Sequence, residues 1–222
     1  MIRKAALSTL ALASPAFAAA PTWAQVNTEA GWVHDSVMTG ETAKIDVSTR
    51  TIAGTACFRA RAQTHANPDK LLEVAADIEG SKQWSSAGLA EAKLLSKTGG
   101  QLDYYQVLDV PGWTMASDRF WFLHGTVERP AGSIFFRWER LEQGGAYRSQ
   151  WQGVKTRYSS AVEPPVNVGG WVFTGSGPVD IKYYICTDSG GSIPKTLQTA
   201  ATRRTLPATV DDLVKEARKR TK

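Results

Sequence analysis

The chain has 222 residues, a formal net charge of +5 and an ordinary hydrophobic content of 42%. This length suits one domain with a sizeable core and is too short for two comfortable ones. No repeat, coiled-coil heptad or low-complexity linker divides it, and no apolar run is long enough for a membrane helix. We expect a monomer without a nucleic-acid partner, a cofactor or a metal ion.

The N-terminus has the organisation of a secretory signal. Two basic residues precede a short run of small apolar residues, and Ala16–Ala18 supplies the small-x-small pattern of a cleavage site. The apolar run is too short to span a bilayer. The sequence therefore predicts a signal peptide over residues 1–18, with a cut as late as Ala24 as the alternative. The mature domain, residues 25–222, would then be periplasmic or secreted.

The first part of this domain predicts an irregular opening followed by strands. Gly31–His34 favours a short helix or turn, and Lys44–Arg50 favours a strand. Thr55–His65 alternates with period two, which is typical of a half-buried antiparallel strand. Its apolar face consists of Ala56, Phe58, Ala60 and Ala62, and its charged face of Cys57, Arg59, Arg61 and Gln63.

A helix and then a run of strands follow. Asn67 and Pro68 begin the helix, because asparagine caps N-termini and proline is tolerated at the first helical position. Apolar residues continue at helical spacing, and we expect the helix to end near Gly80. Thr98–Gln101 contains the glycines of a hairpin turn. Strands are predicted over residues 92–96, 102–110, 118–128, 133–141, 147–151, 159–162, 170–174 and 179–187.

The last segment predicts a long amphipathic helix. Ser192 would cap it, Pro194 would sit in its first turn and Pro207 would kink it. Apolar residues recur along one face at helical spacing. A long helix after an antiparallel sheet is an α+β arrangement, in which the helix lies across the concave face of the sheet.

Cations gather at the end of this helix. One interpretation is transient contact with an anionic membrane surface or with another acidic partner. The other is a solvated helix end whose cations complement the helix dipole. The residues concerned are Lys215, Arg218, Lys219, Arg220 and Lys222.

Several short motifs occur in the order and spacing of a known family. Pro111–Trp113 forms a turn that leads into the arginine-containing strand at Ser117–Phe120, and Asp188–Pro194 opens the last helix. Asp77 followed by Trp84 is a weaker match. The chain from about residue 31 to 220 thus resembles a START-type (StAR-related lipid-transfer) domain of the helix-grip superfamily, in a bacterial exported form.

The resemblance implies a curved antiparallel sheet wrapped around the long kinked C-terminal helix, with an internal cavity between them. It also implies binding, and possible carriage, of a lipid, sterol or other hydrophobic small molecule. The alternative is an enzyme of the polyketide cyclase type on the same scaffold. We expect no catalytic residues, since the three histidines have no metal-ligand spacing and accompany no nucleophile motif.

The tryptophans are the first candidates for ligand contact. The chain has eight of them, and each offers a large apolar ring with one polar N–H, which suits a pocket wall or rim. Filling the core is the ordinary alternative for any one of them. The residues predicted to bind the ligand are Arg119, Trp84, Trp113, Trp121, Trp171 and Tyr183.

Arg119 poses a question about the phase of its strand. In one register it shares the buried face with Trp121 and Leu123, where a guanidinium needs an ion-pair partner or a polar ligand group. In the opposite register Arg119 is exposed, and Phe120 and Phe122 are buried. The sequence leaves both registers open, and with them a ligand contact or a structural ion pair.

The two cysteines lie in strands that the resemblance pairs. In helix-grip folds the first long strand and the last strand run antiparallel side by side. Aligning His65 with Val179 then places Cys57 within about one residue of Cys186, on the face expected outside. Cross-strand neighbours are close enough for a bridge in an oxidising compartment. We predict a Cys57–Cys186 disulfide; the alternative is a pair of free thiols.

Overall fold

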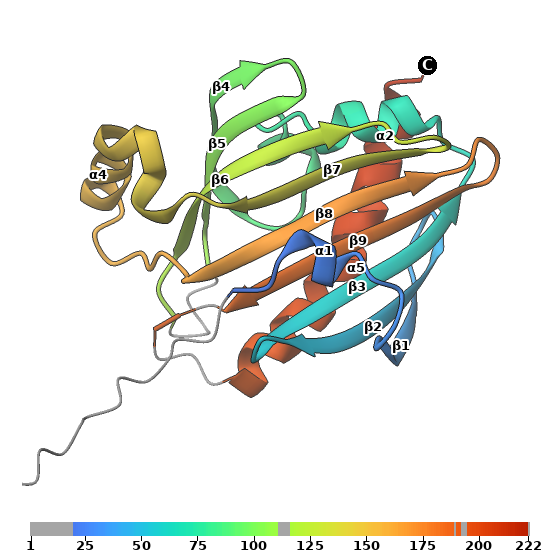
Figure 1. Ribbon diagram of the computed structural model, residues 1–222, viewed down its shortest axis with the longest axis horizontal. Helices are drawn as coiled ribbons and strands as arrows, with labels where there is room; N and C mark the ends of the chain where they lie inside the picture. The colour runs from blue at the N-terminus through green and yellow to red at the C-terminus, as the bar shows by residue number, and fades with distance from the viewer. Residues whose placement is uncertain (1–19, 111–115, 189, 192–194, 222) are drawn as a thin grey trace, which may run out of the picture.

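The computed structural model describes residues 20–110, 116–188, 190–191 and 195–221. In this part, nine strands form one curved antiparallel sheet in the order β1-β2-β3-β9-β8-β7-β6-β5-β4 (Figure 1). The strands are β1 (Val33–Thr39), β2 (Lys44–Ile52), β3 (Thr55–Thr64), β4 (Leu89–Thr98), β5 (Gln101–Leu108), β6 (Arg119–Glu128), β7 (Ser133–Arg140), β8 (Val166–Thr174) and β9 (Val179–Asp188).

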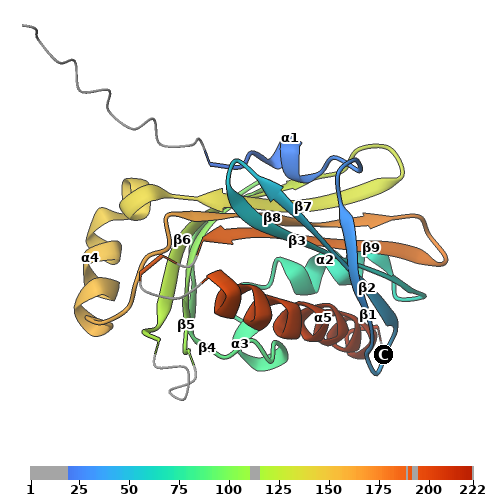
Figure 2. The same ribbon diagram turned by 90° about the horizontal axis from the view of Figure 1, so that it is seen from below.

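Helices cover both faces of the sheet, unequally. The long α5 lies in the hollow of the sheet together with α2 and α3, whereas α1 lies on the opposite face (Figure 2). This confirms the predicted α+β helix-grip architecture. The helices are α1 (Trp23–Val26), α2 (Pro68–Ala75), α3 (Ser81–Trp84), α4 (Arg148–Arg157) and α5 (Lys195–Lys219), with a 3₁₀ segment η2 (Glu142–Tyr147) before α4.

The main core fills the hollow between the sheet and α2 and α5. Phe58, Phe136 and Phe173 from three strands are buried there. Leu213 and Val214 of α5 belong to the same cluster and are fully buried. The predicted apolar stripe of the last helix therefore faces the sheet, which is what places α5 across it.

The start of α2 is as predicted, but its end is not. The side chain of Asn67 accepts hydrogen bonds from the backbone N–H groups of Asp69 (2.8 Å) and Lys70 (3.3 Å), and Pro68 follows as the first helical residue. The helix ends at Ala75, before the expected Gly80. Beyond it the carboxylate of Asp77 accepts the Gly80 N–H at 3.0 Å and closes a turn before α3.

Two predicted strands are wrong. Residues 147–151 belong to the end of η2 and the first turn of α4, and residues 159–162 make only an isolated bridge from Val162 to Arg119. The reason is tertiary packing. Val154 of α4 is fully buried in a cluster with Phe120 and Phe122 on the outer face of β6, and this contact stabilises a helix of otherwise polar residues.

The opening segment also differs from expectation. The helix lies earlier, at α1, and Val33 and His34 already belong to the edge strand β1 rather than to a helix or turn. Val37 and Met38 of this strand are exposed, so β1 lacks the alternation by which a strand is recognised in sequence.

The charged face of β3 is only partly exposed to solvent. Arg59 is 7% exposed, lies over the ring of Trp32 at 5.1 Å and pairs with Glu29 at 3.0 Å. Trp23 of α1 packs edge-on against Tyr184 of β9. The segment before β1 thus covers this part of the outer face, and the expectation of a solvent-facing strand surface is wrong here.

The predicted disulfide is confirmed. Cys57 and Cys186 are directly opposite each other in the β3–β9 ladder and are joined by a disulfide bond. In the ladder Val179 is opposite Thr64 and not opposite His65 as assumed. This shift by one residue places Cys57 directly opposite Cys186 instead of one residue away. Both cysteines are fully buried beneath the N-terminal segment.

The C-terminal helix is continuous over its described length. It includes Pro207, while the predicted Ser192 cap and Pro194 lie outside the described residues. Among the described helices, none has the length and apolar character that a membrane span requires.

Part of the C-terminal charge is used within the fold. Lys215 pairs with Asp211 at 3.1 Å, and Arg220 pairs with Asp77 at 2.6 Å. Lys215 also pairs with Glu41 at 2.9 Å, outside the helix. The pairs with Glu41 and Asp77 tie the end of α5 to its surroundings and favour the structural reading of these two cations. Lys222 lies outside the described residues, and membrane contact stays a prediction.

Candidate ligand pocket

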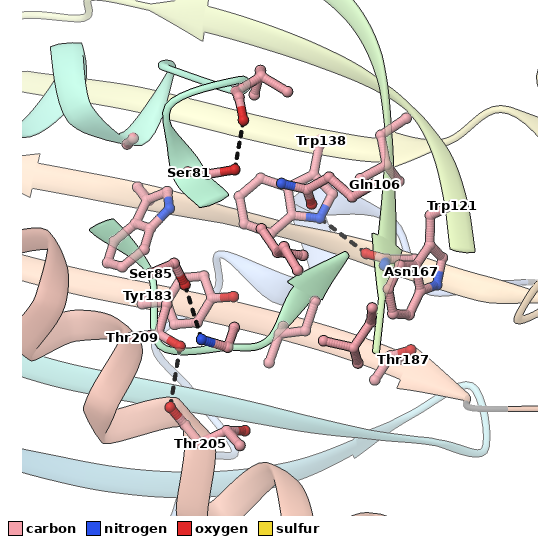
Figure 3. Close-up of a pocket in the computed structure, with 18 of the residues that line it drawn as sticks. Ser81, Ser85, Gln106, Trp121, Trp138, Asn167, Tyr183, Thr187, Thr205 and Thr209 are labelled. Atoms are coloured by element: carbon pink, nitrogen blue, oxygen red, sulfur yellow. Dashed lines mark hydrogen bonds between the residues drawn. The ribbon is translucent and has the colours of Figure 1, made fainter. Parts of the chain in front are cut away.

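A pocket of about 270 Å³ lies between α5, the α3 segment and the concave face of the sheet (Figure 3). Its floor comes from strands β5 to β9, and one wall comes from the α5 residues Thr202, Thr205, Leu206 and Thr209. Residues of the loop after α3, including Ser85 and Ala87, close another side. The pocket therefore sits where the helix grips the sheet.

Aromatic rings form the strand side of this pocket. Trp171 and Tyr183 from neighbouring strands are stacked, with ring centroids 4.1 Å apart, and Trp138 lies 6.1 Å from Tyr183. The indole N–H of Trp138 donates to the side-chain oxygen of Asn167 at 3.0 Å, a bond that holds the ring in place (Figure 3). Such a surface is flat, apolar and pre-organised.

Two tyrosines bring hydroxyl groups to the same pocket. Burial raises the pKa of Tyr183, and burial together with the neighbouring Tyr183 raises the pKa of Tyr104. Each phenol therefore stays neutral over the physiological pH range and can donate a hydrogen bond. No hydrogen bond contributes to either shift within the described part of the chain.

Two indole N–H groups on pocket-lining residues have no partner. The Nε1 atoms of Trp84 and Trp121 are buried, and neither forms a hydrogen bond in the described structure. A buried donor without an acceptor costs about 1–3 kcal/mol, so such groups are uncommon in folded proteins. Both nitrogens lie beneath neighbouring atoms and not at the accessible surface of the pocket.

The loop beside the pocket is fastened to α5 by one carboxylate. Asp212 accepts the backbone N–H of Ser86 at 2.8 Å and the Ser86 hydroxyl at 2.6 Å. Ser85 and Ala87, on either side, line the pocket. The contact is exposed, so water can compete for the two hydrogen bonds that fasten this part of the wall to α5.

The structure brings four of the predicted ligand-binding residues to this pocket. Trp84, Trp121, Trp171 and Tyr183 all line it, although they come from α3, β6, β8 and β9. Their role in binding stays a prediction. Trp113 lies outside the described residues.

Arg119 lies apart from the four. It is 4% exposed, is absent from the pocket lining, and donates to the backbone oxygens of Asp118 (3.2 Å) and Gly190 (3.3 Å). Burial lowers the pKa of its guanidinium. The register that buries Arg119 is confirmed, but the opposite face is not exposed as that register implied: Phe120 and Phe122 are fully buried too, because α4 covers them.

Most of the other lining residues were missed in the sequence. Among them are four polar or aromatic residues of the floor: Tyr104, Gln106, Trp138 and Asn167. Trp138 continues the alternation of Ile134 and Phe136 along its strand, so its inward direction could have been read. Gln106 and Asn167 give no such signal, because a polar residue on a buried face looks like an interruption of the pattern.

The ionisable groups that could do chemistry lie elsewhere. His124 pairs with Asp103 at 2.6 Å, and Asp103 also accepts the hydroxyl of Tyr147 at 2.9 Å, but none of the three lines the pocket. No group of three or more histidine, cysteine or acidic residues among the described residues could hold a metal ion.

Comparison by sequence finds little. No family model matches the chain. An uncharacterized protein of Pseudomonas aeruginosa is 31% identical over 123 residues, which are 54% of this chain and 55% of that protein. The match thus spans about half the length of the relative.

Comparison by structure is more informative. A STAR-related lipid transfer protein from Xanthomonas axonopodis is similar with a TM-score of 0.69 and 25% identity, over 85% of this chain and 99% of that one. Human StAR-related lipid transfer protein 5 is similar with a TM-score of 0.70 and 14% identity, over 88% of this chain and 90% of that one. A Streptomyces aromatase/cyclase is similar with a TM-score of 0.54 and 14% identity, over 75% of this chain and 95% of that one.

Fold and pocket together define a helix-grip protein with a potential small-molecule site under its last helix. Its fold is that of the START-type domains. The solved structures with this fold include both lipid-transfer proteins and an aromatase/cyclase, so the fold by itself leaves the activity open.

Proposed function

We propose that this protein binds an apolar small molecule in the pocket under α5 and carries it outside the cytoplasm. The observation that carries the proposal is the pre-organised aromatic wall of Trp138, Trp171 and Tyr183, closed by the helix that grips the sheet. Burying roughly 200 Å² of apolar ligand surface against it would contribute about 5 kcal/mol, enough to hold a poorly soluble molecule.

Carriage is favoured over catalysis by the chemistry of the lining. General acid–base catalysis needs a group whose pKa lies near neutral pH. The lining residues that the structure describes include no aspartate, glutamate, histidine, lysine, arginine or cysteine, and the pKa values of Tyr104 and Tyr183 are raised. A cyclase remains the alternative, in which polar wall groups would only orient a reactive chain.

Export is proposed on two grounds. The N-terminal sequence has the organisation of a signal peptide, and the Cys57–Cys186 disulfide fits an oxidising compartment. Trp23 packs against Phe135 and Tyr184, so a cut after residue 18 preserves a contact that a cut after Ala24 would remove.

The test compares how much ligand the protein captures when a new tryptophan ring fills the pocket and when the same ring lies outside it. Thr205→Trp places a large ring at the α5 wall, and Ala208→Trp places the same ring at an exposed position of the same helix that does not line the pocket. Wild type and Ala208→Trp, purified from the native host, should yield an apolar molecule in the organic extract by mass spectrometry. Thr205→Trp should retain about tenfold less. Equal extracts from both variants would contradict the proposal.

Release is proposed to involve the loop that Asp212 fastens. Asp212→Ala removes the one oxygen that accepts both Ser86 hydrogen bonds and should speed ligand dissociation by about tenfold, because hydrogen bonds to a charged group contribute about 1.5–3 kcal/mol and solvent exposure reduces this. Stopped-flow transfer to vesicles measures the rate. Asp180→Asn, which alters a side-chain contact with Gln63 at the far end of β9, is the control. An unchanged rate in Asp212→Ala would show that this contact does not gate the pocket.

A further inference from the structure

A second cavity lies beside the pocket, next to the turn that follows α2. It is a groove of about 810 Å³ between α2, the β4–β5 hairpin and the end of β6. Its apolar lining belongs to the main core and includes Leu72, Leu102 and Val127. Four acidic and three basic side chains also line it, Arg129 and Arg220 among them. The groove thus combines an apolar lining with a rim that carries both signs of charge.

The groove and the pocket lie end to end along the same face of β5 and β6. On β5, Leu102 lines the groove, while Tyr104 and Leu108, two and six positions further along, line the pocket. On β6, Val127 lines the groove and Leu123 lines the pocket. Side chains an even number of positions apart in a strand point to the same side, so the two cavities share one floor. At about 3.4 Å per residue, this floor runs for about 20 Å between Leu102 and Leu108.

One side chain borders both cavities. Among the described lining residues, Ile78 alone lines the pocket and the groove. It lies between α2, which ends at Ala75, and α3, which begins at Ser81. The N–H of Ser81 (3.3 Å) and its hydroxyl (2.5 Å) both donate to the carbonyl oxygen of Ile78 (Figure 3). These bonds hold the backbone of the turn, so the Ile78 side chain is the partition between the two cavities.

The two cavities offer a ligand different surroundings. The stacked aromatic wall of the pocket suits an apolar chain. At the rim of the groove, the ion pairs Arg129–Asp69 (2.7 Å) and Arg220–Asp77 (2.6 Å) place both signs of charge beside the apolar lining. A molecule with one apolar chain and one zwitterionic head has the same division. Its chain can be buried while its head stays with water and charged groups, which avoids the cost of burying a charge.

We infer that the pocket and the groove are two halves of one elongated site for a single-chain amphiphile. The chain passes Ile78 into the pocket, and the zwitterionic head lies at the charged rim of the groove. This inference rests on the proposed function and narrows it to a ligand class. A change in the rotamer of Ile78 joins the two cavities, and each methylene then buried raises the affinity by about fourfold.

The test locates the two ends of a bound probe. The probe is palmitoyl lysophosphatidylcholine, which has one chain and a zwitterionic head, with a nitroxide either near the head or near the end of the chain. Each version is added in equimolar amount to isotope-labelled wild-type protein, and the nitroxide broadens the amide signals nearest to it. The head label should broaden Gly100 and Val127 most strongly, and the chain-end label should broaden Leu108 and Thr187 most strongly.

A substitution at the partition tests whether the chain passes it. Ile78→Trp enlarges the side chain between the cavities, so the chain no longer reaches the pocket. The affinity for unlabelled probe, measured by titration calorimetry, should fall at least tenfold, because each methylene that is no longer buried costs about fourfold. Lys82→Trp is the matched control, because it adds the same ring at an exposed residue of α3 that lines neither cavity. Its affinity should equal that of wild type.

The outcomes separate the inference from the proposed function. No binding of the probe, both labels in the same cavity, or the reverse placement of the two labels overturns the inference, and these measurements need no variant. So does an unchanged affinity in folded Ile78→Trp. If the labels fail to separate while Thr205→Trp loses the molecule that wild type captures, the inference is wrong and the proposed function stands. If Thr205→Trp retains every molecule that wild type does, the proposed function fails.

Discussion

Replacing Cys57 and Cys186 together by alanine is expected to lower the free energy of unfolding by about 5 kcal/mol. The two residues are 129 positions apart, and a bridge that closes so long a loop removes much of the conformational freedom of the unfolded chain. Domains of this kind are typically stable by about 5–15 kcal/mol, so the loss would threaten folding itself. Both side chains are also fully buried, which adds a small cavity cost.

Urea unfolding followed by tryptophan fluorescence measures this effect. Wild-type protein with a reducing agent should unfold near the midpoint of the double variant, and the double variant should not respond to the reducing agent. Thiol titration of unfolded, unreduced wild-type protein should detect no reactive thiol. Two reactive thiols, or equal midpoints for oxidised and reduced wild type, would contradict the structure.

Asp211→Ala is expected to cost about 3 kcal/mol and to loosen the β1–β2 hairpin. The carboxylate accepts the N–H groups of Glu41 (3.1 Å) and Thr42 (2.7 Å) and the hydroxyl of Thr42 (2.6 Å), and it is 6% exposed. Hydrogen bonds to a charged group each contribute about 1.5–3 kcal/mol. A Cβ at Gly40 would lie 2.6 Å from this carboxylate, so the turn is built closely around it.

The same carboxylate predicts how stability depends on pH. Burial by itself raises the pKa of Asp211, but hydrogen bonds from Thr42, Glu41 and Lys215 outweigh it, and its pKa lies below the ordinary value. Its stabilisation is therefore fully present above the ordinary aspartate pKa, near pH 4, and is lost as the pH falls through the lower, folded-state value.

Urea midpoints of wild type and Asp211→Ala should consequently converge on acidification. The difference between them should be constant from pH 5 to pH 7 and should shrink toward pH 2. Asp180→Asn, an exposed contact at another edge of the molecule, should run parallel to wild type over the same range. A difference that grows with acid would contradict the assigned role of Asp211.

Much of the sheet could be predicted from local patterns. The alternation around Phe58 and Ala60 identified β3, and Asn67 with Pro68 identified the start of α2. The glycines before Gln101 identified the hairpin between β4 and β5. These signals are reliable because turns, caps and half-buried strands impose their chemistry on a few adjacent residues.

Other elements depended on contacts that a short window does not contain. α4 is polar apart from Val154 and the aromatic residues beside it, and it is a helix because that residue packs against Phe120 and Phe122. For the same reason Arg119 and Phe120, neighbours in one strand, are both buried. When both faces of a strand are covered, buried residues no longer alternate with exposed ones. The sequence then does not show which face of the strand points into the core.

The candidate site was predicted by residue type more than by position. Trp121 and Trp171, chosen as large aromatic residues, both line the pocket, and their role in binding stays a prediction. The direction of an indole N–H, and whether it meets an acceptor as in Trp138 or none as in Trp84, follows from side chains brought together from distant strands. No spacing in the chain contains that information.

By itself the sequence determined the fold class, the inward face of β3 and, through the family resemblance, the pairing of Cys57 with Cys186. Each of these depends on periodicity along one or two strands or on a family motif. Only the tertiary structure decided which described residues line the pocket, that these include no charged side chain, and that Arg119 is not among them. The physical reason is that burial and hydrogen bonding depend on which elements pack over a residue, and the covering elements, α4 and α5, come from distant parts of the chain.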